Sequence, residues 1–218
     1  MATGSASLSN MSVIAAGQNQ GLLMPKLQFR FRVTFSNLGR NSGDNLTLTR
    51  QVIDCGRPNV QFQEITLPVY NSTLYLAGKA TWQTIPINIR DDAGGAVSTA
   101  IGAQLQSQMD FAEQASASTG ADYKFQTTID ILDGGNGANV PATLESWELY
   151  GCFIQTANYN TLNYGTNEAV TISLTLRFDN ASCTVNNNST VVGGLIGPGH
   201  IPGTVTSTVS GVGAGPIN

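Results

Sequence analysis

Few residues in this chain have the chemistry that acid–base or nucleophilic catalysis requires. The only histidine is His200, within the stretch "GPGHIPG". Nucleophilic catalysis usually depends on a base that titrates near neutral pH, and histidine is the side chain suited to that role. The sequence places no second titrating group beside His200, so we interpret it as a bystander. The sequence therefore predicts no catalytic residue.

Carboxylates occur in two close pairs, which raises the possibility of acid–base catalysis by two acids. Asp91 and Asp92 precede a helical pattern, where a carboxylate caps the first turn. Glu145 and Glu148 fall in a strand pattern beside Trp147, and no cleft or sugar-binding surface can be argued around them. Both pairs are therefore interpreted as structural.

The three cysteines are scattered, at positions 55, 152 and 183, and show no CxxC spacing. They predict neither a metal site nor a disulfide framework. We expect no cofactor, and a reducing cytosol is the simplest compartment. Residues 1–24 also lack the basic start and continuous apolar run of a secretory signal.

Charge is confined to the middle of the chain. Only 11% of the 218 residues are charged, and all of these lie between Lys26 and Asp179. This division predicts an uncharged N-terminal arm over 1–25, a folded domain over 26–181 and an uncharged C-terminal arm over 182–218. Arg30 and Arg32 share a strand face and could touch phosphate, but acidic residues outnumber basic ones 14 to 10. We favour intersubunit or sheet-surface salt bridges for these arginines over DNA binding.

Hydrophobic periodicity predicts a mainly β fold. Period-two alternation marks strands at 26–35, 46–55, 74–90, 123–132, 144–157 and 170–178. Apolar residues spaced by four, from Val97 to Met109, predict one helix over about 96–114. The predicted fold is an antiparallel β-sandwich or open barrel with one flanking α-helix.

The strand at 170–178 presents two different faces. Its apolar side, from Val170 to Phe178, must face a core. The other side carries the small hydroxyls of Thr171, Ser173 and Thr175 and a single charge, Arg177, where a solvent face usually carries Lys and Glu. Alternation defines the two faces but does not reveal what lies beyond either of them.

The segment 57–70 is unusually apolar for a connection. Pro58 and Pro68 interrupt it, so it is expected to be an extended loop with strand-like pieces. Over residues 60–78 such a loop is too apolar to remain in water, and we expect a partner to bury it. The residues that predict this contact are Ile65, Leu67, Val69, Tyr70 and Leu74.

The order of these elements, together with three phrases, resembles the tail tube proteins of contractile-tailed bacteriophages. The phrases are "MPKLQFRFRVTF", "LPVYNSTLYLAGKATWQTIPINIRDD" and "ESWELYGCFIQTANYNTLNYGTNEAVTISLTLRFD", and the likeness covers roughly residues 25–181. The resemblance implies rings of six copies stacked into a hollow tube, with neighbouring sheets closing a β-barrel around the lumen. It also implies that the 60–78 loop reaches the adjacent ring.

In that resemblance the protein is part of a virion tail, assembled in the cytoplasm of the bacterial host. Its partners would be copies of itself and the tail sheath, baseplate and tail terminator proteins. Genomic DNA would pass through the lumen without specific binding, and neither a small-molecule substrate nor membrane insertion is expected. Thr171, Ser173 and Thr175 are then candidates to line the lumen, because a wall without cations does not hold a sliding polyanion. Contact with another subunit, or with solvent, is the alternative for this face.

Three other functions remain open from the sequence. A tube subunit of a phage-like contractile injection or secretion particle would share the ring and carry a different cargo. A β-sandwich hydrolase would require a catalytic base that the sequence does not supply. A β-sandwich carbohydrate-binding module would require a cluster of exposed aromatic residues. Only Tyr159 and Tyr164 in the sequence suggest such a cluster.

Overall fold

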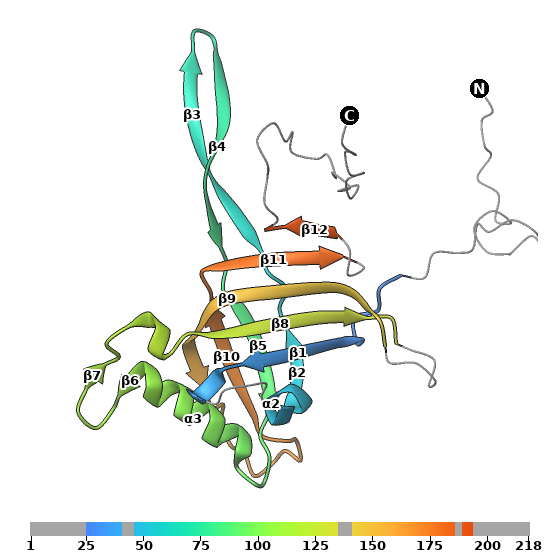
Figure 1. The fold of residues 1–218 in the computed structure, drawn as a ribbon, viewed down its shortest axis with the longest axis vertical. Helices are drawn as coiled ribbons and strands as arrows, with labels where there is room; N and C mark the ends of the chain where they lie inside the picture. Colours follow the sequence, from blue (N-terminus) through green and yellow to red (C-terminus); the bar gives the residue numbers. More distant parts are fainter. Residues whose placement is uncertain (1–24, 41–45, 135–140, 186–188, 194–218) are drawn as a thin grey trace, which may run out of the picture.

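The computed structural model describes residues 25–40, 46–134, 141–185 and 189–193. These residues form antiparallel sheets flanked by helices, so the predicted fold class is confirmed (Figure 1). The strands are β1 (Phe31–Ser36), β2 (Val52–Cys55), β3 (Val60–Val69), β4 (Ser72–Trp82), β5 (Ile85–Arg90), β6 (Met109–Asp110), β7 (Ala115–Ser116), β8 (Phe125–Leu132), β9 (Thr143–Asn158), β10 (Thr171–Arg177), β11 (Asn180–Val185) and β12 (Ser189–Val192). The helices are α2 (Leu46–Gln51) and α3 (Ala96–Gln108), with short 3-10 turns η1 (Leu38–Arg40) and η2 (Gly120–Asp122).

The long strand β9 connects the two halves of the main sheet. Its first half pairs with β8 on one side and β11 on the other, and β1 and β12 extend this half outward. Its second half pairs with β10, which is followed by β5 and β2. Every one of these pairings is antiparallel, as hairpin-rich sequences favour.

A glycine marks the point where β9 changes partners. Gly151 has φ +67, a backbone conformation that side chains with a Cβ rarely adopt. A Cβ there would also lie only 2.3 Å from Asp179 Oδ2. Glycine is therefore required where the strand passes from β11 to β10.

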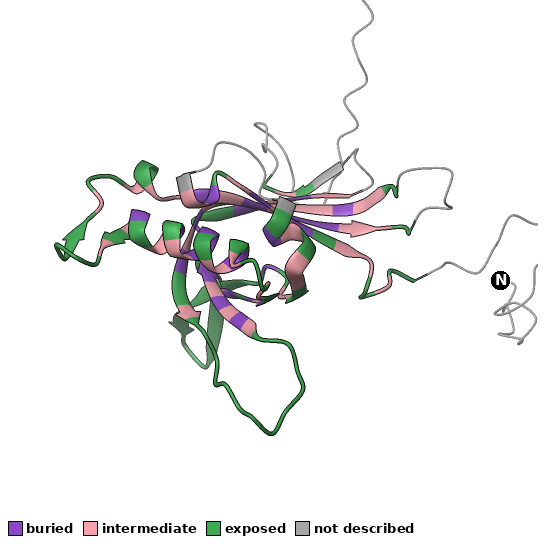
Figure 2. Cartoon of the chain, turned by 90° about the horizontal axis from the view of Figure 1, so that it is seen from below, coloured by how far each residue is buried: buried purple, intermediate pink, exposed green. Residues whose placement is uncertain are grey.

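Buried apolar side chains from both halves of the sheet, α2 and α3 form one core. Figure 2 shows these buried positions along the strands and on the inward side of the helix. The residues with the least exposure include Phe35, Leu48, Ile85, Ile87, Ile89, Ile101, Leu149, Ile172, Leu174 and Leu176. Burial of this apolar area supplies the main driving force for folding.

Helix α3 begins and ends differently. At its start Gly95 is the N-cap residue, and the backbone N–H of Val97 donates to Asp92 Oδ1 at 3.0 Å. The Asp92 carboxylate therefore satisfies a first-turn donor, as predicted, from a position before the N-cap. The helix ends at Gln108, so the prediction that it continues to 114 was wrong. Met109 is extended, and Met109–Asp110 pairs with Ala115–Ser116 as a small hairpin.

Two glutamines one turn apart attach α3 to backbone groups of other elements. Gln104 is buried, accepts from the Gly39 N–H at 2.8 Å and donates to the Tyr123 carbonyl at 2.6 Å. Gln108 both donates to the Ile154 carbonyl at 3.0 Å and accepts from its N–H at 2.9 Å. The Gln108 amide thus takes the place of a neighbouring strand where β8 no longer pairs with β9.

Three predicted strand boundaries are corrected. The segment 74–90 is not one strand but parts of two, β4 and β5, which belong to different sheets and are separated at residues 83–84. The segment 46–55, expected to be one strand, is helix α2 followed by the short strand β2. An alternating pattern of six residues is too short to distinguish a strand from a helix, and here the helix buries Leu48. The strand expected from Lys26 begins at Phe31, since β8 offers no partner beyond Leu132, and Phe29 is 74% exposed.

The expected arms are only partly within the described residues. The boundary at 182 falls inside β11, where Ala181 and Cys183 are buried. The first residues of the predicted C-terminal arm therefore belong to the sheet. Residues 1–24 and 194–218, including His200, lie outside the described part. Among the described helices, none has the length and apolar character needed to cross a membrane.

Candidate assembly surfaces

The hydroxyl side of β10 belongs to a wider polar face. Residues paired across an antiparallel sheet point to the same side, and the pairing register places Arg90, Asn88 and Pro86 of β5 beside Thr171, Ser173 and Thr175. On the other side of β10, Asn158 and Thr156 of β9 lie beside Ser173 and Thr175. We call these eight residues, with Asp54 of β2 opposite Asn88, the polar face. The three predicted residues therefore share one continuous, nearly neutral surface.

A loop residue that sequence reasoning missed contacts this face. Asn160 Nδ2 lies 2.9 Å from both the carbonyl and the hydroxyl oxygen of Thr171, and 3.3 Å from Ser173 Oγ. On the same strand, Ile172, Leu174, Leu176 and Phe178 are buried as predicted, whereas Val170 is 45% exposed. Val170 lies just before β10 and was wrongly assigned to the core.

Residues 60–69 of the segment 57–70 form strand β3 rather than the expected loop. Strands β3 and β4 pair with each other alone and project from the rest of the molecule as a long hairpin (Figure 1). Pro68 is compatible with this arrangement because each strand of a two-stranded hairpin has a free edge that requires no N–H. Pro68 therefore marked a strand with a free edge, whereas Pro58 is buried and lies before β3 begins at Val60.

One side of this hairpin is aliphatic. Ile65 pairs with Leu76, Leu67 with Leu74, and Val69 with Ser72, so their side chains share a side. We call Ile65, Leu67, Val69, Leu74 and Leu76 the apolar hairpin face; sequence reasoning found all of them except Leu76. The exposed fractions of these five side chains range from 43% for Leu67 to 56% for Leu74. Tyr70, at the tip, is fully exposed with φ 43. A contiguous exposed apolar surface of this kind indicates an interaction site.

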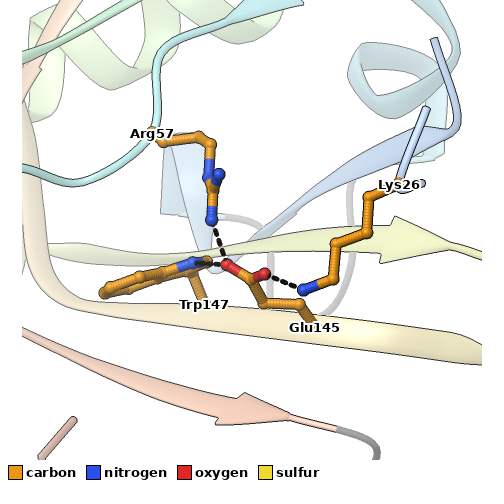
Figure 3. Close-up of polar contacts among 4 residues, drawn as sticks. All are labelled: Lys26, Arg57, Glu145 and Trp147. Carbon is orange, nitrogen blue, oxygen red and sulfur yellow. Dashed lines mark hydrogen bonds and ion pairs between the residues drawn. The ribbon is translucent and has the colours of Figure 1, made fainter. Parts of the chain in front are cut away.

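The base of the hairpin is held by a carboxylate. Glu145 is 5% exposed and forms ion pairs with Lys26 and Arg57, while Trp147 Nε1 donates to Glu145 Oε1 at 2.6 Å (Figure 3). Lys26 follows the N-terminal segment, and Arg57 precedes β3. Glu145 therefore ties both segments to β9, and it has a positioning role in place of the acid–base chemistry considered from the sequence.

The environment of Glu145 keeps it ionised. Burial alone would raise its pKa, but the hydrogen bonds from Lys26 and Trp147 and the charges of Arg57 and Lys26 outweigh burial, so the pKa lies below the usual 4.5. A carboxyl group whose pKa is lowered by folding stabilises the fold fully above its unfolded pKa. This contribution disappears as the pH falls through the folded value.

Glu145→Gln is expected to lower the free energy of unfolding by about 1–3 kcal/mol at pH 7, because charged hydrogen bonds to Lys26 and Arg57 are lost. The difference in the free energy of unfolding between this variant and wild type should become smaller as the pH falls below 4.5. Urea titrations at pH 7 and at acidic pH measure both effects. Glu148→Gln, on the same strand, is the matched control and should change stability by about 0.5 kcal/mol or less. An equal effect of the two variants would contradict the role of Glu145.

The remaining candidates from the sequence are structural in the described residues. Arg32 forms an ion pair with the buried Asp130 at 2.7 Å, which confirms the sheet-surface salt bridge for this arginine. Arg30 precedes β1 and donates to the backbone carbonyl of Asp133 instead. Asp91 accepts from Ser98 Oγ at 2.9 Å beside the helix start. Burial raises the pKa of Cys55 to about 12 and that of Cys152 to about 11, which disfavours the nucleophilic thiolate form of both. Across the described ranges, no group of three or more His, Cys, Asp or Glu could hold a metal ion.

Comparison with known proteins identifies the fold. No protein-family model matches the chain, and none of the curated proteins matches it. Solved structures do match. A chain of the anti-feeding prophage cap, the AFP tube-terminating cap, has a TM-score of 0.57 at 14% identity, covering 79% of this chain and 99% of that one.

Two chains from an extracellular contractile injection system, PVC, are similar to the same extent. The sheath/tube terminator in the extended state gives a TM-score of 0.57 at 13% identity, covering 76% of this chain and 100% of that one. A chain of the sheath–tube complex in the extended state gives a TM-score of 0.55 at 14% identity. The match covers 83% of this chain and 99% of that one. The chain thus has a fold found in tube-terminating caps and sheath–tube complexes of contractile injection systems.

Proposed function

We propose that this chain is a ring-forming subunit of the inner tube of a contractile injection particle. The observation that carries the proposal is the apolar hairpin face, which projects from an otherwise complete core and has no cover within the described residues. An isolated two-stranded hairpin is marginally stable in water, so a partner that covers it contributes to its order. A tube of stacked rings supplies such a partner in every layer.

The open edges of the sheet support ring formation. In the half of the sheet that carries the polar face, β2 ends one side among the described strands. On the other side, the outer edge of β9 has no described strand partner beyond Cys152, and because the Gln108 side chain already bonds to Ile154, the edge left open is residues 155–158. Exposed strand edges favour pairing with another chain, and closure of a ring removes them. A head-to-tail contact of these two different edges generates a closed ring from identical subunits. The polar face then lines a barrel, and the core lies outside it.

The tail tube of a contractile phage is a narrower form of this proposal. It adds genomic DNA as the cargo, with sheath, baseplate and terminator proteins as partners. The hydroxyl and amide character of the polar face supports passage of a polyanion, since few cations are available to retain phosphates. An injection particle with a different cargo places the same requirements on the subunit, and the fold comparison favours this broader form.

A terminating ring is the second candidate. The similar structures include both a tube-terminating cap and a sheath/tube terminator. A terminator closes one end of a tube, so it would form single rings without stacking on itself.

Negative-stain microscopy of the purified protein, together with sedimentation, tests these candidates. We expect rings that stack into tubes as concentration rises. Single rings without tubes would select the terminator over the tube subunit. A monomer at every concentration would contradict both functions.

Replacing Thr171, Ser173 and Thr175 together with Lys tests whether the polar face lines the lumen. The fold should persist because these side chains point away from the core, while each subunit gains three cations on that face. Assembled tubes should then retain short DNA roughly tenfold longer or more at low salt, with retention abolished at high salt. Timed release of labelled DNA measures the effect. Release at the wild-type rate at both salt concentrations would place the face outside the lumen.

A further inference from the structure

The connection between β9 and β10 forms a second exposed apolar surface. Within residues 158–170, Tyr159, Leu162, Tyr164 and Val170 are all exposed, Leu162 by 78%. The loop encloses a hollow of about 470 Å³, lined by residues 159–164, 166 and 168–171. We call this feature the loop hollow. The ribbon of this loop projects from the domain in Figure 2, coloured as exposed.

Hydrogen bonds hold the loop hollow open. Asn160 attaches one side of it to Thr171, as described above. At the far end, the Gly165 N–H donates to Asn163 Oδ1 at 2.8 Å. On the other side, the Asp91 N–H donates to the Val170 carbonyl at 2.9 Å. These bonds fix the backbone of the loop, and its large apolar side chains are exposed.

The loop hollow and the hairpin lie at opposite ends of the same strands. Strand β5 begins at Ile85, where the chain returns from the hairpin, and ends at Arg90. Arg90 pairs with Thr171, the residue that follows the loop, and Ile85 pairs with Leu176. Figure 1 shows this separation along the long axis of the molecule. One copy therefore cannot place its hairpin tip in its own loop hollow.

We propose that the loop hollow receives the hairpin tip of a second copy in the next ring. This inference rests on the proposed function and identifies the surface that the hairpin contacts. The occupant is the apolar tip between Ile65 and Leu76, with Tyr70 at its end. The two surfaces are different and lie at opposite ends, so each docking leaves a free hairpin and a free hollow, and the contact propagates from ring to ring.

The charges of the two surfaces favour this contact. Residues 65–76 contain no charged side chain, and residues 158–171 contain only Glu168. Burial of a charge without a partner is costly, and this contact requires the desolvation of at most one. The aromatic residues Tyr70, Tyr159 and Tyr164 are of the type enriched at the centres of protein interfaces.

A complementation experiment tests the direction of the contact. The hairpin variant carries Leu67→Asp and Val69→Asp, and the loop variant carries Leu162→Asp. Each variant by itself should give single rings, because in every ring-to-ring contact either the hairpin or the loop hollow is altered. An equal mixture of preformed rings should give pairs of rings, since an intact hairpin from the loop variant meets an intact hollow from the hairpin variant. Circular dichroism and thermal unfolding verify that both variants are folded.

Disulfide cross-linking tests the location of the contact. The double variant Tyr70→Cys with Tyr164→Cys should form intersubunit disulfides roughly tenfold more than either single variant, because docking raises the effective concentration of the two thiols. Background from native cysteines is small because Cys152 and Cys183 are buried, and the pKa of Cys55 is raised to about 12.

Three outcomes separate this inference from the proposed function. If the loop variant forms normal tubes, or if the double cysteine variant forms tubes without cross-links, the hairpin does not dock in the loop hollow. The proposed tube function would remain intact in both cases. Single rings of the wild-type protein without cross-links would also overturn docking by a second copy and support the terminator. A protein that forms no rings would overturn the proposed function itself.

Discussion

Replacing Ile172 or Leu174 with aspartate is expected to abolish folding of the subunit. Ile172 is 1% and Leu174 2% exposed, and they pair across the sheet with the fully buried Ile89 and Ile87. An unpaired carboxylate in this core costs at least several kcal/mol. Domains of this kind have total stabilities of only about 5–15 kcal/mol. We therefore expect no cooperative unfolding transition by circular dichroism and poor recovery of soluble protein.

Thr175→Asp provides the matched control for these variants. It adds the same charge to the same strand, but Thr175 is half-buried on the opposite face beside Pro86 and Thr156. This variant should fold and unfold cooperatively, with a free energy of unfolding within about 1 kcal/mol of wild type. A folded Ile172→Asp subunit, or an unfolded Thr175→Asp subunit, would show that the two faces of β10 are wrongly assigned.

The double variant Leu67→Asp with Val69→Asp is expected to give folded, soluble subunits that do not stack. The hairpin is outside the core, so two charges on its apolar face do not disturb the packing of the domain. Between rings, however, the same charges would be buried without partners and would prevent the contact. We expect tube length, measured by electron microscopy, to fall to single rings, with the unfolding transition nearly unchanged.

The opposite side of the hairpin supplies the control for stacking. Thr66→Asp with Thr73→Asp adds the same charge to the same two strands, but Thr66 pairs with Tyr75 and Thr73 with Pro68, away from the apolar hairpin face. These subunits should form tubes of wild-type length. Equal loss of stacking in both double variants would mean that charge anywhere on the hairpin prevents assembly, and the apolar face would lose its proposed role.

Alternation in the sequence was sufficient to predict the two faces of β10 and the fold class. Period two places every second side chain on one side of a strand, whatever the strand pairs with, so Ile172, Leu174 and Leu176 had to be buried together. Apolar composition, rather than alternation, led to the prediction that the residues between Ile65 and Leu74 require cover. Composition added the confinement of charge to the middle of the chain.

The partners of each element were decided by tertiary structure. Segments 46–51 and 109–114 show patterns too short to distinguish helix from strand, and their final forms depend on contacts with distant residues. The hairpin became visible only when β3 and β4 paired with each other and with no other strand. The register also placed Asn88 and Asn158 beside Ser173, which turned three hydroxyls into a face.

The candidate site was the part least accessible from the sequence. Glu145 looked like one half of a carboxylate pair with Glu148, whereas its true partners, Lys26 and Arg57, lie 119 and 88 residues away along the chain. Asn160 and the loop hollow had no signal beyond two tyrosines. Local patterns record which side of an element is buried, because that depends on neighbours in sequence. Long-range contacts between polar groups depend on how strands pair, and only the folded chain brings those groups together.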